Sequence, residues 1–130
     1  LVVDYNPEVI GILKKKKVSC IYGDVTSPEL LDKINLKKLR LVISTIPDYG
    51  ETLHLLKKIK RVAPKVKVVV TGSRISEALR LYKAGADFVV TPKIIAGQEL
   101  AEVIHGSKMD LKKEKRKHLK HLSEIHKLLY

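Results

Sequence analysis

An aspartate follows the first hydrophobic stretch of the sequence, where a carboxylate could bind a sugar. Residues 1–4 read Leu-Val-Val-Asp, which predicts a short buried strand with Asp4 at its tip. A carboxylate at the end of such a strand can accept hydrogen bonds from both hydroxyls of an adenosine ribose. The alternative is an Asp that only caps the next helix, but Asn6 already occupies the cap position before Pro7. The pattern therefore favours a ligand role for the segment from Asp4 through Tyr5 to Asn6.

Two further segments at predicted strand ends carry residues that could contact the same ligand. At Gly23-Asp24, glycine permits a close backbone approach, and Asp24 could accept a hydrogen bond from an adenine amino group or simply cap a turn. At Thr45-Ile46, a base or cofactor could pack against the sheet edge. A short apolar strand end before Pro47 is equally compatible with a purely structural role. The residues alone do not decide, for either segment, between contact with a ligand and a structural role.

A glycine-rich phosphate loop is absent from the sequence. The pattern G-x-G-x-x-G does not occur, and the seven glycines are isolated from one another. In a dinucleotide-binding unit, the acidic residue that holds the ribose ends the second strand, about 20 residues after that loop. Asp4 would be this acidic residue, so we expect the chain to begin just after the loop and to lack the first strand and helix of such a unit.

Short apolar runs alternate with segments of helical period along the chain. The predicted strands cover residues 1–4, 18–22, 41–45, 66–71 and 88–91. Helix starts are expected at Pro7, at Pro28 and after Asp48, and further helices over residues 76–84, 94–105 and 110–130. In the helix over 76–84, Leu79 and Tyr82 are expected to face the core, with Gly85 as the C-cap. This alternation predicts an α/β fold with a mostly parallel sheet covered on both faces, and ligands bind at the carboxyl ends of its strands.

Composition places the chain among ordinary globular domains with a basic surplus. It has 130 residues, 45% of them hydrophobic and 31% charged, with a formal net charge of +12. A single cysteine, Cys20, excludes an internal disulfide. From Ser107 onward, eight Lys or Arg face three Asp or Glu, so we separate a basic amphipathic helix over 107–130 from a domain over 1–106. Aromatic residues are only 5% of the chain, which disfavours stacking of single-stranded nucleic acid.

Four segments, in this order and spacing, resemble the Trk/Kef-type nucleotide-binding domain, also called the RCK N-terminal domain. They are Leu1–Ile10, Ile21–Thr26, Leu41–Pro47 and Ala84–Pro92. Members of this family are cytoplasmic regulatory domains of potassium channels, potassium uptake systems and cation/proton antiporters. The resemblance implies a Rossmann-like three-layer sandwich whose first βα unit is missing here, and a bound NAD(H) or adenine nucleotide, with binding weak or absent in this chain alone.

The resemblance also implies roles for individual residues. Asp4 would hold the ribose, and Gly23, Asp24 and Val25 would lie on the adenine side. Thr45 and Ile46 would lie near the pyrophosphate or nicotinamide half, with Arg74 as a phosphate contact. In this family, helices after the sheet join two domains into a dimer, so the implied partners are a second copy and a membrane transport subunit. No catalytic residue is implied.

The expected absence of the first strand raises a question about the sheet. In the strand order 3-2-1-4-5-6, the first strand lies at the centre, and its removal exposes two unpaired edges. We expect the first and third strands of this chain to pair directly, or a second copy to fill the gap.

Other functions remain as alternatives of lower rank. The basic helix over 107–130 could bind nucleic acid or act as a scaffold. Its apolar stripe, with Leu119, Leu122, Ile125 and Leu129, favours packing on a partner, and contact with anionic lipid remains open. His118 and His121 share a helix face but lack further ligands for a metal site. An oxidoreductase is disfavoured because no general acid/base constellation occurs.

Overall fold

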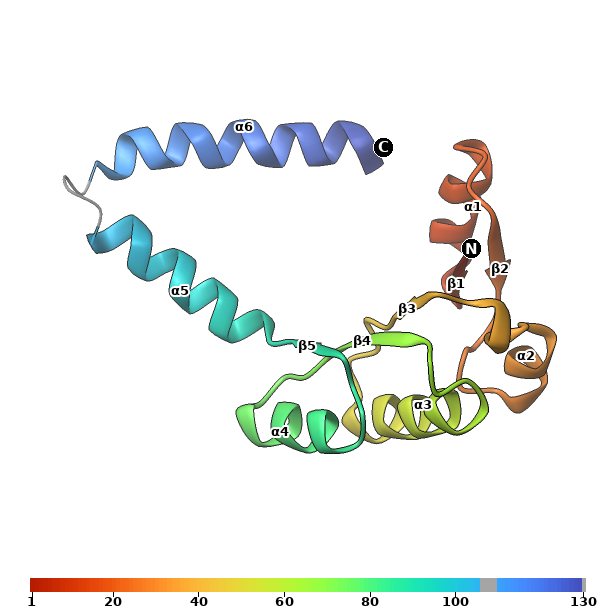
Figure 1. The fold of residues 1–130 in the computed structure, drawn as a ribbon. Helices are drawn as coiled ribbons and strands as arrows, with labels where there is room; N and C mark the ends of the chain where they lie inside the picture. Colours follow the sequence, from red (N-terminus) through yellow and green to blue (C-terminus); the bar gives the residue numbers. More distant parts are fainter. Residues whose placement is uncertain (106–109, 130) are drawn as a thin grey trace. The chain divides into compact units, whose positions relative to one another are not determined.

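The computed structural model describes residues 1–105 and 110–129, and these form two compact units (Figure 1). Unit 1 comprises residues 1–23 and those described from 96 onward, and unit 2 comprises residues 24–95. Unit 1 holds β1 (Val2–Asp4), α1 (Pro7–Lys15), β2 (Cys20–Tyr22), most of α5 (Pro92–His105) and α6 (Leu111–Leu129). Unit 2 holds α2 (Pro28–Lys33), the 3-10 turn η1 (Leu36–Lys38), β3 (Leu41–Ile43), α3 (Tyr49–Val62), β4 (Lys67–Thr71), α4 (Ile75–Lys83) and β5 (Phe88–Val90). The predicted boundary at 106/107 lies outside the described residues and stays a prediction.

Local signals in the sequence set the helix ends. The side chain of Asn6 accepts a hydrogen bond from the Glu8 backbone N–H at 2.9 Å and caps α1. Ser27 caps α2 and Asp48 caps α3 in the same way. Gly85 follows α4 with a φ of +105°, the left-handed conformation that glycine adopts without strain. The predicted helix starts and this helix end are therefore confirmed.

All strand pairs are parallel. In unit 1, β1 pairs with β2, and in unit 2 the order is β3-β4-β5. The α/β class, the parallel pairing and the helical C-terminal extension are confirmed. Strands are shorter than predicted at several ends, because the ladders stop after three residues in β2, β3 and β5.

The predicted direct pairing of the first and third strands is wrong. Within the described residues, β1 pairs only with β2, and β3 pairs only with β4. A three-residue parallel ladder adds few hydrogen bonds, each stabilising the fold by only about 1 kcal/mol net. In the structure, β1 and β3 belong to different compact units, and each is hydrogen-bonded to a strand of its own unit, β2 or β4. The alternative that a second copy fills the gap stays a prediction.

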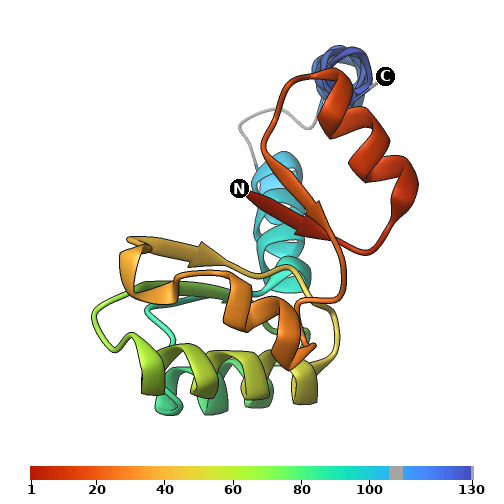
Figure 2. The same ribbon diagram turned by 90° about the vertical axis from the view of Figure 1, so that its right-hand side faces the viewer.

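Two helices cover one face of the sheet in unit 2. Figure 1 and Figure 2 show α3 and α4, which contact each other, on the same side of β3, β4 and β5. The largest fully buried side chains lie between these layers: Leu56, Ile59, Leu81, Val68, Val70 and Thr52. Side chains alternate along a strand, so the opposite face of this sheet presents Leu41, Ile43 and Phe88, which are exposed.

The helix α4 presents a different face to the core than the sequence predicts. Leu81 is 0% exposed and Ala78 is buried, whereas Leu79 is 58% exposed. Tyr82 is also exposed, and its hydroxyl accepts a hydrogen bond from the Val89 backbone N–H at 3.1 Å. A Cβ at Gly72 would lie only 3.4 Å from the Ala78 backbone, so the α4 backbone lies close to Gly72 on the side that carries Ala78. The expectation that Leu79 and Tyr82 face inward is therefore wrong.

Candidate functional site

Asp4 and Gly23 meet at the carboxyl ends of β1 and β2. The Gly23 backbone N–H donates to the Asp4 carbonyl at 3.0 Å, which extends the parallel ladder by one step. Asp4 is half-buried, and its Oδ1 accepts a hydrogen bond from the Asn6 backbone N–H at 2.7 Å. That bond fixes the orientation of the carboxylate, and among the described residues none donates to its Oδ2. This arrangement can accept hydroxyl donors from a ligand beside Gly23.

The two residues after Asp4 differ in what they offer a ligand. Tyr5 is exposed, so its ring is accessible at the end of β1. The side-chain oxygen of Asn6 is occupied by the Glu8 backbone N–H, and Asn6 therefore serves first to start α1. Asn6 also holds Asp4 through its own backbone N–H, so it positions the carboxylate.

Asp24 caps a turn in unit 2. Its Oδ1 accepts hydrogen bonds from the backbone N–H and the hydroxyl of Thr26, at 2.8 and 2.7 Å. These bonds, led by the one from the hydroxyl, lower the pKa of Asp24 below its ordinary value. The neighbouring Val25 is half-buried and packs against the core of unit 2. The structure thus displays the turn-capping role that the sequence left open, with Asp24 exposed and negatively charged.

Thr45 and Ile46 follow β3, in a segment that hydrogen bonds hold on both sides. Ser44 is buried, and its carbonyl accepts a hydrogen bond from the Thr71 hydroxyl at 3.3 Å, which ties the tip to β4. The Ile46 carbonyl accepts from the Thr52 hydroxyl at 3.1 Å, which ties it to α3. Thr45 is exposed between these two anchors. Thr45 can therefore contact a ligand, while Ile46 is half-buried against the core.

Arg74 lies at the start of α4, after β4. The backbone N–H groups of Ser73 and Arg74 both donate to Glu77 Oε2 at 3.1 Å. The Arg74 side chain is 81% exposed, and its Nε lies 4.0 Å from Glu77 Oε1. An exposed pair at this distance contributes about 0–1 kcal/mol, so the guanidinium can leave it to meet a phosphate.

The structure brings the predicted site residues together in two groups. Asp4, Tyr5, Asn6 and Gly23 share the carboxyl edge of the sheet in unit 1. Asp24 and Val25 begin unit 2, and Thr45, Ile46 and Arg74 follow neighbouring strands at the carboxyl edge of its sheet. Both groups lie where ligands bind in parallel α/β sheets.

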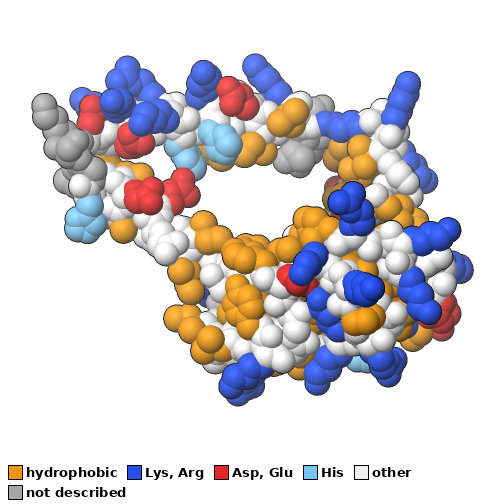
Figure 3. All heavy atoms as spheres, viewed as in Figure 1, with side chains coloured by type: hydrophobic (Ala, Val, Ile, Leu, Met, Phe, Trp, Pro, Cys, Tyr) orange, Lys and Arg blue, Asp and Glu red, His pale blue; other side chains and the backbone are white. Residues whose placement is uncertain are grey.

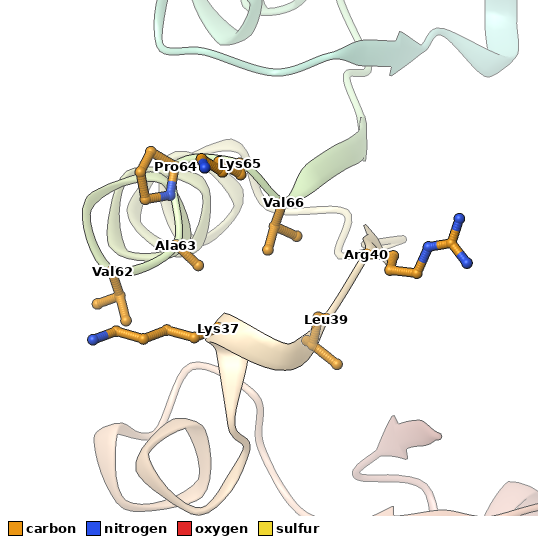
Figure 4. Close-up of a pocket in the computed structure, with 8 residues that line it drawn as sticks. All are labelled: Lys37, Leu39, Arg40, Val62, Ala63, Pro64, Lys65 and Val66. Atoms are coloured by element: carbon orange, nitrogen blue, oxygen red, sulfur yellow. The ribbon is translucent and has the colours of Figure 1, made fainter.

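A pocket of about 490 Å³ lies elsewhere in unit 2, at the amino ends of β3 and β4 (Figure 4). Its apolar wall includes Leu39, Val66 and the end of α3, and Lys37 runs along one side. The guanidinium of Arg40 points away from the hollow in Figure 4. None of the predicted site residues lines this pocket, and it lies at the opposite strand ends.

Sequence reasoning missed the role of Asp87, just before β5. Its carboxylate accepts hydrogen bonds from Lys60 Nζ at 2.6 Å, Lys67 Nζ at 3.0 Å and the Val68 backbone N–H at 2.8 Å. Lys60 Nζ also donates to the Val66 carbonyl at 2.9 Å. This network joins α3, β4 and the start of β5. The only local signal for it is an Asp directly before a strand, which does not reveal its partners.

Residues 1–92 match the TrkA-N domain family. This chain belongs to that family. The match covers the strand ends that carry Asp4, Gly23, Thr45 and Arg74, and it confirms the resemblance found in the sequence.

Curated relatives of this TrkA-N domain are longer potassium transport proteins. The chain is 29% identical to potassium channel protein 1 of Methanocaldococcus jannaschii over 105 residues, which are 79% of the chain and 32% of that relative. It is 24% identical to the glutathione-regulated potassium-efflux system protein KefC of Klebsiella pneumoniae over 87 residues, 67% of the chain and 14% of KefC. The chain thus spans a third or less of the length of these relatives.

Solved structures confirm the Rossmann-like fold of the TrkA-N domain. The TrkA-N domain of the inner membrane protein ybaL from Escherichia coli aligns with a TM-score of 0.73 at 17% identity, over 80% of this chain and 77% of that one. The GsuK channel bound to NAD aligns with a TM-score of 0.71 at 21% identity, over 87% of this chain and 20% of the GsuK chain. The Kef C-terminal domain of Shewanella denitrificans in an AMP-bound form aligns with a TM-score of 0.62 at 15% identity, over 98% of this chain and 95% of the Kef domain.

Replacement of Gly72 by alanine is expected to lower the free energy of unfolding by about 1–2 kcal/mol. A Cβ at this position would lie 3.1 Å from Val89 Cγ1 and 3.4 Å from the backbone of Ala78, so α4 or β5 would have to shift. Urea denaturation followed by circular dichroism measures the change. In the control variant Gly11→Ala, nothing lies within 4 Å of the new Cβ, and the helical position should become more stable by about 0.5–1 kcal/mol. Equal effects at both positions would contradict the packing argument.

Proposed function

We propose that this TrkA-N domain is the cytoplasmic nucleotide-sensing regulatory domain of a potassium channel, a potassium uptake system or a cation/proton antiporter. The observation that carries the proposal is the family match over residues 1–92 together with a half-buried carboxylate, Asp4, fixed beside Gly23 at the carboxyl edge of β1 and β2. The relatives that support it are a potassium channel and a potassium-efflux system. The proposed role is regulation without catalysis.

The ligand of this domain is NAD(H) or an adenine nucleotide. Asp4 fits the ribose, because its carboxylate is held by Asn6 and keeps Oδ2 available for hydroxyl donors. Gly23, Asp24 and Val25 contact the adenine side, and Thr45 and Ile46 lie near the pyrophosphate or nicotinamide half. Arg74 contributes a phosphate contact. Related structures were determined with NAD and with AMP, which supports this class of ligand.

The residues present fit the ribose better than the phosphates. No glycine-rich loop occurs in the sequence, and Arg74 is the only candidate phosphate contact among the site residues. A strand, glycine-rich loop and helix ahead of Leu1 would supply the missing phosphate cradle. The chain by itself should therefore bind nucleotide weakly or not at all.

Regulation requires a partner that responds to the bound nucleotide. A nucleotide can shift a linked transport protein only if it binds two states of that protein with different affinity. The partner is a membrane transport subunit or domain, to which this domain is attached on the cytoplasmic side. In the described part of the chain, no helix is both long and apolar enough to cross a bilayer. The domain acts as a homodimer or higher oligomer.

Calorimetric titration with NADH, NAD, ATP and AMP tests the nucleotide site. It is performed on this chain and on a version extended upstream by a strand, glycine-rich loop and helix, at two salt concentrations. The extended version should bind, and Asp4→Ala should weaken its binding at least tenfold, because the ribose hydroxyls lose their acceptor. The control Asp32→Ala removes the same charge from an exposed residue of α2 and should leave the affinity unchanged.

Two outcomes would contradict the nucleotide site. Equal losses for Asp4→Ala and Asp32→Ala would show that only net charge matters. Absence of nucleotide binding, together with nucleic-acid binding that falls steeply with salt, would favour the alternative of a basic nucleic-acid-binding or scaffold module that acts through α6.

A further inference from the structure

Two adjoining hollows lie in unit 2, away from the carboxyl ends of its strands. The first hollow is the pocket of about 490 Å³ at the amino ends of β3 and β4, and the second has a volume of about 450 Å³. Both are lined by Lys37 and Val62, so they adjoin where η1 meets the end of α3. The two volumes fall in the range of about 300–1,000 Å³ that is typical of sites for small molecules.

The first hollow has apolar walls. Figure 4 shows it between the stem of Lys37 on one side and the turn that holds Ala63 and Val66 on the other. Ala63 and Val66 are buried, and Leu39 beside them is half-buried. Of the described residues, none that lines this hollow is Asp or Glu. An apolar chain or ring that enters the first hollow would therefore be shielded from water, with no carboxylate close by to repel an attached anion.

The second hollow holds a lysine whose charge is poorly compensated. The side chain of Lys58 is only 17% exposed, and its Nζ lies 3.7 Å from Oδ1 of Asp32, a side chain that is 76% exposed. Among the described residues, no oxygen accepts a hydrogen bond from this ammonium. The pKa of Glu29 is lowered mainly by hydrogen bonds from its own backbone N–H and from Ser27, and less by the charge of Lys58. A largely buried ammonium favours an anionic acceptor, so Lys58 is suited to hold an anion.

Two further lysines line the second hollow. They are Lys33 and Lys37, which are exposed, and neither side chain has a hydrogen-bond or ion-pair partner within the part of the chain that the structure describes. In Figure 4 the ammonium of Lys37 lies beside Val62, where the two hollows adjoin. Figure 3 shows Lys and Arg side chains around smaller patches of hydrophobic side chains over α2, η1 and the end of α3. The second hollow thus sets three cations against one carboxylate, that of Asp32.

We propose that the two hollows together bind one small amphipathic anion, an organic acid with an apolar chain or ring and a single carboxylate. The apolar part lies in the first hollow, against Leu39 and Val66. The carboxylate lies in the second hollow, where it accepts charge-assisted hydrogen bonds from Lys58 and Lys37. This site goes beyond the proposed function, because nucleotide is expected at the opposite ends of the strands.

The extent of the apolar surface favours a small molecule over a protein segment. A specific protein interface covers about 800 Å² on each partner. The residues next to these hollows in the sequence, Lys38, Lys57 and Arg61, are exposed and basic. The apolar contact is therefore confined to one hollow, which has room for one chain or ring rather than for a row of anchoring side chains.

An NMR titration of the full chain with decanoate, below the concentration at which it forms micelles, tests the site. The amide signals of residues 36–40 and 58–66 should shift, and those of residues 4–6 at the proposed nucleotide site should not. Decanoate should bind at least tenfold more tightly than acetate, which lacks the chain, and than decyltrimethylammonium, which carries the opposite charge. From butanoate to decanoate, the affinity should rise by up to about fourfold for each added methylene that the first hollow buries. Equal affinities for all these probes, or shifts centred on the exposed sheet face at Leu41 and Phe88, would overturn the proposal.

Charge variants measure which residues hold the carboxylate. Lys58→Met keeps the stem of the side chain, removes its charge, and should weaken decanoate binding at least tenfold. The matched control is Lys57→Met, the next residue, which is exposed and lines neither hollow, and it should bind nearly as well as the parent chain. Asp32→Asn should strengthen binding about twofold to fivefold because it frees Lys58, whereas Glu51→Gln, at an exposed position of α3, should not. Equal effects within either pair would mean that net charge alone drives binding, and the proposal would fail.

A peptide of alternating Glu and Leu completes the test. If the peptide shifts the same amide signals at a tenfold lower concentration than decanoate does, an acidic protein segment occupies the hollows and the assignment to a small molecule is wrong. If it binds no more tightly than decanoate, the assignment stands. None of these measurements uses nucleotide, so their result is independent of the proposed sensing function.

Discussion

Asp87→Ala is expected to lower the free energy of unfolding by about 2–3 kcal/mol, because it removes three hydrogen bonds to one carboxylate at once. The carboxylate accepts three hydrogen bonds, two of them from lysines, and the side chains of Lys60 and Asp87 are only 20% and 27% exposed. Its removal leaves the Val68 backbone N–H without its acceptor and places Lys60 beside Lys67 without a counter-charge. Urea denaturation followed by circular dichroism measures the loss.

The control for this change is Asp32→Ala. Asp32 pairs with Lys58 at 3.7 Å and its side chain is 76% exposed, so its removal should change the free energy of unfolding by less than about 1 kcal/mol. If both variants lose the same amount, the Asp87 network does not hold α3, β4 and β5 together as described.

The same network predicts a dependence of stability on pH. The hydrogen bond from Lys60, followed by those from Val68 and Lys67, holds the pKa of Asp87 far below its ordinary value. An unfolded Asp has a pKa of about 3.9, so below that pH the unfolded state binds more protons than the folded state. The contribution of Asp87 is therefore complete above about pH 4 and decreases as the pH falls towards its lowered native pKa. The Asp87→Asn variant should lose this part of the acid dependence, which unfolding curves between about pH 2 and 6 would show.

Leu81→Ala is expected to cost about 3 kcal/mol of unfolding free energy. Leu81 is 0% exposed between α4 and the sheet, so truncation leaves a cavity among packed side chains. The matched control is Leu79→Ala in the same helix, where a side chain that is 58% exposed should contribute no more than about 0.5 kcal/mol. Urea midpoints of the two variants check this difference. Equal losses would mean that α4 packs with the face that the sequence alone indicates.

Much of the fold of this chain could be predicted because its signals are local. Asn6, Ser27 and Asp48 each bond a backbone N–H two or three residues away, and Pro at the first helical position and Gly85 after α4 act through their own backbone angles. The four segments that resemble the family also carry the strand ends, and the family match over residues 1–92 confirmed the resemblance. These features depend on neighbours in the chain, which the sequence displays directly.

The candidate site could be predicted only in part. The sequence placed Asp4 and Gly23 at strand ends, and parallel pairing brought them together. For Asp24 the sequence left two roles open, and only the hydrogen bonds from Thr26 display one of them. Arg74 could be located after β4, but the position of Glu77 beside its backbone came from the structure.

The sequence by itself determined the element order, the starts of α1, α2 and α3, the end of α4 and the family of this protein. The tertiary structure alone decided that β1 and β3 do not pair, that Leu81 rather than Leu79 faces the core, and that Asp87 joins two lysines 27 and 20 residues away. The physical reason is that these features depend on which surfaces meet. A helix with apolar residues on two sides can bury either, and a carboxylate finds distant donors only after neighbouring strands have fixed their register.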